Sequence, residues 1–132
     1  MQHLSDTYPS DLSLRYDLGV LQFEAGEITS AIQSFQCSQA NPHKEIPSLM
    51  HMGKCFAKRG MNDMAAGTLQ KALDKKEIMD DEKMDLHYQL GCVLDLMARA
   101  EESIEQFKLI YERDIGYRDV ADRVDAYYAS LG

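Results

Sequence analysis

The residues of this sequence that could do chemistry are mainly cysteines and histidines, and their spacing argues against a reactive site. Cys37, Cys55 and Cys92 are odd in number and form no C-x-x-C pair, so they predict reduced, buried thiols rather than a disulfide framework. His51 and Cys55 lie four residues apart, which is the spacing of two metal ligands on one helix face. A zinc site would also need His87 and Cys92 to converge on them, and we predict no metal site.

Motifs for catalysis are also missing from the sequence. It contains no glycine-rich phosphate loop, no H-E-x-x-H and no G-x-S-x-G. A Cys–His nucleophile pair or paired carboxylates would need a pocket from which water is excluded. We therefore expect no enzyme activity and no cofactor.

Composition narrows the class of protein further. The chain has 132 residues, 45% hydrophobic and 27% charged, which suits one soluble helical domain. The net charge of −8 disfavours nucleic acid and anionic membranes as partners. No apolar run approaches the roughly 20 residues that span a bilayer, and the first residues do not form a signal peptide. With reduced cysteines, these features predict a cytoplasmic protein.

The strongest pattern in the sequence is a dipeptide that recurs at a helical-repeat period. Gly19, Gly53 and Gly91 each follow a large apolar residue, at intervals of 34 and 38 residues. A small residue follows each glycine by 12 positions and a large apolar residue by 16: Ala31, Ala65 and Ser103, then Phe35, Leu69 and Phe107. Because glycine inside a helix costs about 1 kcal/mol against alanine, a packing reason is needed. We predict that Gly19 crosses closely over Ala31.

These residues resemble the tetratricopeptide repeat (TPR), a helix–turn–helix unit. The match is Tyr16-x-Leu18-Gly19…Ala31…Phe35, then Met52-Gly53…Ala65…Leu69-x-x-Ala72, then Tyr88-x-Leu90-Gly91…Ser103…Phe107. Arg15, Leu49 and His87 replace the large aromatic residue often found near the start of each repeat. The resemblance covers about residues 10–115. It implies an all-α fold, a right-handed superhelical array of three antiparallel helix pairs, closed by a C-terminal capping helix.

We divide the chain by this repeat. An N-terminal segment (1–9) precedes repeat 1 (10–43), repeat 2 (44–81), repeat 3 (82–115) and the cap (116–132). The phase of Pro9 favours a segment that ends an earlier repeat, as in a fragment of a longer protein; a natural N-terminal tail is the alternative. The run from Tyr117 to Ala121 is similar to the closing helix of some bacterial multi-repeat proteins, which implies a bacterial origin.

Helices are predicted at 10–25, 27–39, 47–59, 62–75, 82–97, 100–113 and 117–131. We expect Ser10 or Asp11 and Asn62 to cap their helices, and Gly26 and Gly60 to make left-handed turns. Leu14, Leu18 and Leu21 predict an inward apolar stripe. Residues 77–82 extend the preceding helix or its loop. The last helix should cover the apolar side of Leu109 and Ile110.

The resemblance also implies where a partner would bind, because the first helices of TPR pairs line a groove that commonly takes a protein segment. The groove positions here are Tyr16, Val20, Phe23, Met50, Lys54, Ala57, Lys58, Tyr88, Cys92 and Asp95. We predict Tyr16, Met50 and Tyr88 as anchors, with Lys54 and Lys58 as a basic spot. Tyr16 and Val20 replace the lysine and asparagine with which some TPR proteins grip chaperone tails, so that ligand is not expected.

Two alternatives stay open at this point. The aromatic groove residues could simply fill space between adjacent first helices. The array could also be a structural spacer, or a self-assembling arm of a larger repeat protein, without a peptide ligand.

Overall fold

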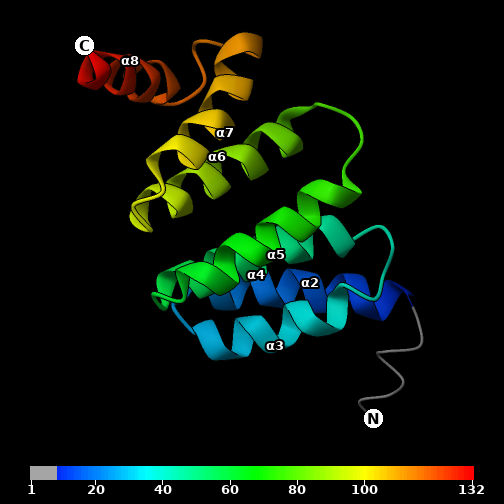
Figure 1. The fold of residues 1–132 in the computed structure, drawn as a ribbon. Helices are drawn as coiled ribbons and strands as arrows, with labels where there is room; N and C mark the ends of the chain where they lie inside the picture. Colours follow the sequence, from blue (N-terminus) through cyan, green and yellow to red (C-terminus); the bar gives the residue numbers. More distant parts are fainter. Residues whose placement is uncertain (1–8) are drawn as a thin grey trace. The chain divides into compact units, whose positions relative to one another are not determined.

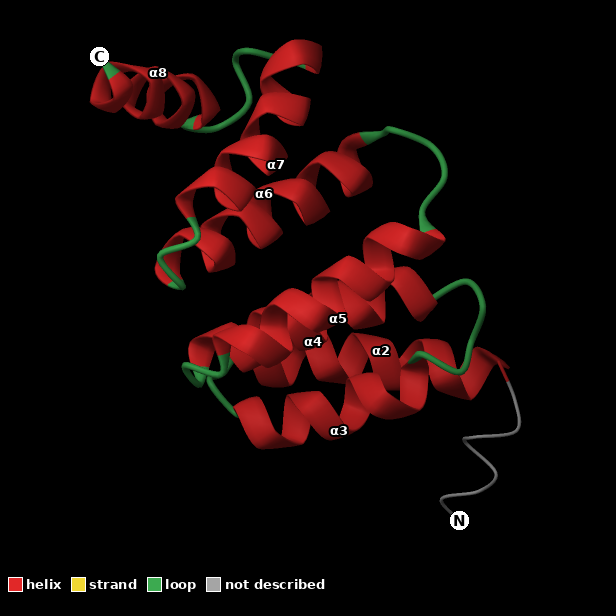
Figure 2. Ribbon diagram, in the orientation of Figure 1, coloured by secondary structure: helices red, strands yellow, loops and turns green. Residues whose placement is uncertain are grey.

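The computed structural model describes residues 9–132, and these form seven α-helices and no strand (Figures 1 and 2). The expected all-α fold is confirmed. The segment expected to end an earlier repeat lies mainly in residues 1–8, outside the described part. The helices are α2 (Pro9–Glu24), α3 (Ile28–Ser38), α4 (Glu45–Lys58), α5 (Asn62–Lys75), α6 (Asp81–Leu96), α7 (Ala100–Arg113) and α8 (Val120–Leu131).

The chain divides into two compact units. The first contains α2 to α5 and ends at Lys76, and the second begins at Glu77 and contains α6 to α8. In each unit, consecutive helices pack as pairs: α2 with α3, α4 with α5, and α6 with α7. The insertion before α6 forms a loop and does not extend α5, since α5 ends at Lys75. Among the described helices, none has both the length and the apolarity needed to cross a membrane.

Close approach at the repeated glycines holds each pair together. A Cβ atom added to Gly19 would lie 2.7 Å from Cε1 of Phe35, and one added to Gly91 would lie 2.7 Å from Cζ of Phe107. At Gly53 the nearest atom is Cγ of Leu69, also at 2.7 Å. Real Cβ atoms do not come so near to another heavy atom, so no other residue fits without displacement. The expected close crossing is present, and the atoms nearest to Gly19 belong to Phe35. The counterparts of Ala31 lie at the other two glycines: the backbone oxygen of Ala65 is 3.5 Å from the added Cβ of Gly53, and Oγ of Ser103 donates a 2.7 Å hydrogen bond to the backbone oxygen of Gly91.

The repeated glycines give a prediction for stability. Replacing Gly53 with alanine should lower the free energy of unfolding by about 1–3 kcal/mol, because the new methyl group overlaps the buried side chain of Leu69. Gly67 lies inside α5 with open space around it, so the same change there should raise this free energy by up to about 1 kcal/mol. Urea unfolding followed by circular dichroism measures both, and effects of equal sign would contradict the packing argument.

The turns between paired helices agree with expectation. Gly26 and Gly60 have φ values of 83° and 77°, and Ala98 takes the same left-handed conformation at 61° in the third pair. The predicted helix caps are wrong. Helix α2 begins at Pro9, whose missing N–H is harmless there, so Ser10 and Asp11 lie inside the helix. Asn62 is the first residue of α5 and no cap.

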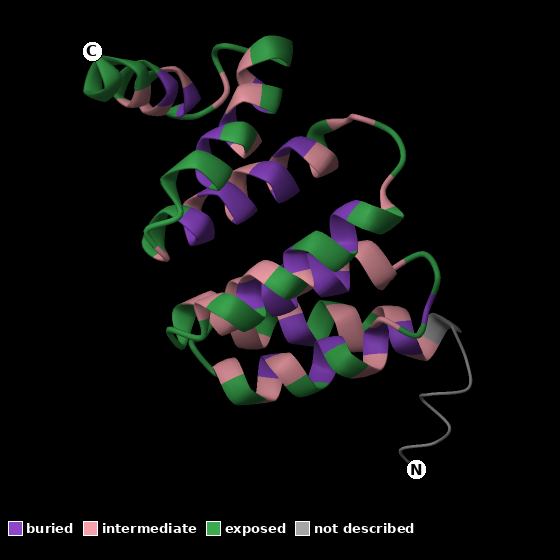
Figure 3. Ribbon diagram, in the orientation of Figure 1, coloured by how far each residue is buried: buried purple, intermediate pink, exposed green. Residues whose placement is uncertain are grey.

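The leucine stripe of α2 points the opposite way from the prediction. Leu14, Leu18 and Leu21 are 66%, 44% and 64% exposed, whereas Leu12 and Gly19 are buried. Figure 3 shows both buried and exposed segments along α2. The close crossing explains this difference, because it turns the glycine side of α2 toward α3. Neighbouring residues point about 100° apart around a helix, so the leucines lie away from that side.

Helix α8 closes the core of the second unit. Val120 and Val124 are buried in one cluster with Ile104, Phe107 and Ile110 of α7. The expected capping contact is therefore present, although Leu109 stays 44% exposed and is not covered. Helix α8 also begins three residues later than predicted. Residues 117–119 form a turn in which Arg118 has a φ of 44°.

Candidate functional site

Two aromatic rings of α2 frame a histidine of α4 in the first unit. Tyr16 and Phe23 are half-buried and seven residues apart, so they lie on one side of α2, about two turns from each other. The ring of His51 meets both edge-on, at centroid distances of 5.6 and 5.9 Å. It also stacks on buried Phe35 of α3 at 5.1 Å. The three helices thereby hold His51 in a fixed aromatic frame.

Polar contacts fix the orientation of the His51 ring. Its Nδ1 lies 3.1 Å from the backbone oxygen of Pro47, one turn earlier on α4, and 3.4 Å from the hydroxyl oxygen of Tyr16. Tyr16 of α2 is therefore linked to α4 through its hydroxyl group. We expect this linkage to make the site rigid, which reduces the entropy lost when a ligand binds.

Lysine side chains stand over the two rings. Nζ of Lys44, just before α4, is 4.9 Å from the ring centre of Tyr16, and Nζ of Lys58, at the end of α4, is 5.6 Å from that of Phe23. At these distances an ammonium group is attracted to the face of an aromatic ring. Together Tyr16, Phe23, Lys44, His51 and Lys58 form what we call the aromatic–lysine face. Its rings offer apolar contact and its ammonium groups can pair with carboxylates.

Of the other groove residues predicted in the first unit, Val20 packs against the same cluster as the two rings, and Lys58 lies over Phe23. Lys54 and Ala57 of α4 are half-buried. Met50 is different: its side chain is only 8% exposed, so it belongs to the core and does not serve as a surface anchor. Lys44 and His51 belong to this face although neither was among the predicted groove residues.

The third predicted anchor, Tyr88, is already engaged within the second unit. Its hydroxyl donates a 2.7 Å hydrogen bond to Oδ1 of Asp119. The guanidinium groups of Arg118 and Arg123 stand over its ring, at 4.7 and 5.8 Å from the ring centre. Burial, followed by the bond to Asp119, raises the pKa of Tyr88 to about 12. Tyr88 is therefore already in contact with side chains of its own unit, from α8 and the turn that leads into it.

The same turn and helix engage the other predicted groove residues of α6. Asp95 is exposed and its Oδ2 lies 3.8 Å from Nη1 of Arg123, which also pairs with Asp119. Burial raises the pKa of the Cys92 thiol. Burial also raises the pKa of Cys55 to about 11, which leaves that thiol protonated and unreactive near neutral pH. Cys55 is fully buried as expected, whereas Cys37 and Cys92 are half-buried.

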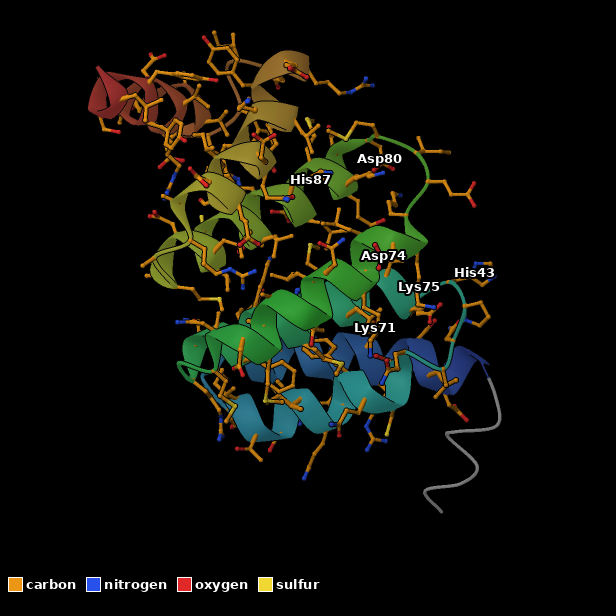
Figure 4. The ribbon with its side chains drawn as sticks, viewed as in Figure 1. His43, Lys71, Asp74, Lys75, Asp80 and His87 are labelled. Atoms are coloured by element: carbon orange, nitrogen blue, oxygen red, sulfur yellow. The ribbon has the colours of Figure 1, made fainter. Side chains whose placement is uncertain are left out.

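Neither unit alone contains all four residues that were considered as zinc ligands, because His51 and Cys55 lie in the first unit and His87 and Cys92 in the second. His51 belongs to the first unit, where rings surround it. His87 belongs to α6 of the second unit, is buried, and has its Nδ1 2.8 Å from Oε1 of Gln106 (Figure 4). Within the described residues, no group of three or more His, Cys, Asp or Glu side chains is placed to hold a metal ion.

Solved structures share this fold, although no protein-family model matches the sequence and no curated protein matches it significantly. The crystal structure of MamA covers 99% of this chain and 74% of its own, with a TM-score of 0.80 at 18% identity. The chain has a TPR-like helical-repeat fold. A second neighbour is the type III secretion chaperone SycD of Yersinia enterocolitica, solved in complex with a peptide of the translocator YopD. It covers 93% of this chain and 96% of its own, with a TM-score of 0.79 at 17% identity.

Proposed function

We propose that this chain is a protein-interaction module that binds a peptide segment of a partner on the aromatic–lysine face. The observation that carries the proposal is the pair of half-buried rings, Tyr16 and Phe23, each beneath a lysine ammonium group. A segment lying along α2 would contact both rings, which are about 10 Å apart along the helix. SycD, which has the same fold, is itself solved with a peptide.

The chemistry of the face favours a segment that is apolar and acidic. Aromatic side chains tend to dominate binding energy, because they bury a large area with few rotatable bonds. Exposed ion pairs contribute only about 0–1 kcal/mol each, so Lys44, Lys54 and Lys58 should set specificity more than affinity. Val20 and Ala57 would add apolar surface beside the rings. Catalysis is no part of the proposal.

The proposed site differs from the ladder of anchors that the sequence suggested. Met50 is buried and Tyr88 carries its own partners, so neither is included. His51 and Lys44 are added to the proposed site because each contacts a ring that a ligand would also contact: His51 contacts Tyr16 and Phe23, and Lys44 contacts Tyr16. The proposed site then lies entirely within the first unit, on α2 and α4 and the residue that precedes α4.

Selection from a random peptide library tests the proposal without a known partner. The full chain is the target, and peptides that pair an aromatic or large aliphatic residue with Asp or Glu should be enriched. A parallel selection on Tyr128→Ala, an exposed position in α8, should return the same peptides. If no peptides are enriched, or if those enriched are basic, the proposal is wrong.

The alternative is a structural spacer or a self-assembling arm of a larger repeat protein. The exposed leucines of α2 are compatible with it, because an adjoining helix of a larger repeat protein could cover them. Light scattering across a concentration series separates the two functions. A chain that stays monomeric and binds selected peptides supports the interaction module, whereas a chain that assembles and selects no peptide supports the alternative.

A further inference from the structure

One side of α2 is an exposed apolar surface that the aromatic–lysine face does not include. It consists of Leu14, Leu18 and Leu21, which we call the outer leucine face. Residues two apart in a helix point about 200° from each other, so Leu14 and Tyr16 lie on nearly opposite sides of α2. A single exposed leucine is common on protein surfaces, but three at spacings of four and three form one continuous stripe.

Helix α4 shows what kind of element covers such a face. The 34-residue repeat places the counterparts of the outer leucine face on α4, and these are Ser48, Met52 and Cys55. All three are buried. Oγ of Ser48 lies 2.6 Å from Oγ of Ser38 in α3, and Met52 and Cys55 pack in one cluster with Phe35. The element that covers these three positions of α4 is therefore a helix.

Charge at the edge of the outer leucine face indicates which helix would fit. Asp17 and Glu24 lie between the leucines and the aromatic side of α2, and both are exposed. Neither forms an ion pair with a base in the described part of the chain. The counterparts of these acids in α4 are His51 and Lys58. The edge of the outer leucine face therefore carries carboxylates, whereas the matching edge of α4 carries none. A helix docked on α2 would meet carboxylates along that edge.

We propose that the outer leucine face binds an amphipathic helix of a partner protein, one with an apolar ridge and lysine or arginine side chains along one edge. The ridge takes the place that α3 takes on α4, and the bases pair with Asp17 and Glu24. A second copy of α2 fits less well. In an antiparallel pair the acids of both copies would lie along the same edge and repel each other.

A designed peptide provides the probe, and the full chain is the receptor. The peptide is a fluorescent amphipathic helix of about 16 residues, the length of α2, with leucine and alanine on its ridge and lysines along one edge. Fluorescence anisotropy should show binding to the full chain. Leu18→Glu should weaken binding at least about tenfold, whereas Leu96→Glu, at a 70% exposed site in α6, should leave it unchanged.

Charge exchange tests the specificity. Changing Asp17 and Glu24 together to lysine should weaken binding of the lysine peptide about tenfold and strengthen binding of its glutamate version. The double variant Tyr16→Ala, Phe23→Ala should keep its affinity for the lysine peptide, so this proposal and the peptide-binding function can fail separately.

Three results would overturn the proposal. They are no binding of the lysine peptide, equal affinity for the lysine and glutamate peptides, and no effect of Leu18→Glu. Light scattering can give a fourth such result. If the unchanged chain forms a dimer and Leu18→Glu dissociates it, a second copy of the chain occupies the outer leucine face.

Discussion

Replacing Phe107 with alanine is expected to lower the free energy of unfolding of the second unit by about 3–5 kcal/mol. Phe107 is only 2% exposed, and its ring fills the space left by the absent side chain of Gly91. The same ring packs in the cluster that joins α7 to Val120 and Val124 of α8. Its removal would therefore loosen both the α6–α7 pair and the capping contact. Hydrogen exchange of the backbone amides of α6 to α8 measures the loss directly.

Leu109→Ala is the matched control for this substitution, because it lies on the same helix but is 44% exposed. It should change the free energy of unfolding by less than about 1 kcal/mol. Similar losses for the two variants would mean that the core of the second unit is not built around Phe107. Exchange in α2 to α5 should change little in either variant if the two units unfold separately.

The second large effect is expected at the aromatic–lysine face. The double variant Tyr16→Ala, Phe23→Ala should weaken binding of a selected peptide by about 2–4 kcal/mol, roughly 30- to 1000-fold. Lys58→Glu should weaken it by only about 0–1 kcal/mol, and this smaller effect should decline as salt is added. Isothermal titration calorimetry measures both, with circular dichroism to show that each variant remains helical. Larger loss from the lysine than from the rings would contradict the assignment of anchors.

Much of the fold could be predicted because its determinants are local and repeated. Each repeated glycine precedes a large apolar residue by 16 positions, and the structure places that residue's side chain at the glycine. Gly26 and Gly60 likewise reveal their left-handed turns within a few residues of sequence. The leucine stripe of α2 was misread, since periodicity shows that a face is apolar but not which neighbour covers it. When a helix has two apolar sides, its own sequence does not show which of them is buried.

The candidate site was predicted only in part, because contacts between distant residues decide which side chains are available. Tyr88 occupies a groove position in the repeat, but its partner Asp119 lies 31 residues later, in a turn for which the sequence pattern predicts a helix. His51 was considered only as a metal ligand beside Cys55. Its contacts with Tyr16 and Phe23 cross from α4 to α2, and no local spacing signals them.

Chemical-shift mapping by NMR tests the central proposal most directly. The full chain, labelled with 15N, is titrated with the tightest peptide from the selection. We expect the largest shift changes at Tyr16, Val20 and Phe23 of α2 and at His51 and Lys54 of α4. If those amides stay unchanged while the amides of Leu14, Leu18 and Leu21, or those of α6 to α8, shift on binding, the aromatic–lysine face is not the peptide site.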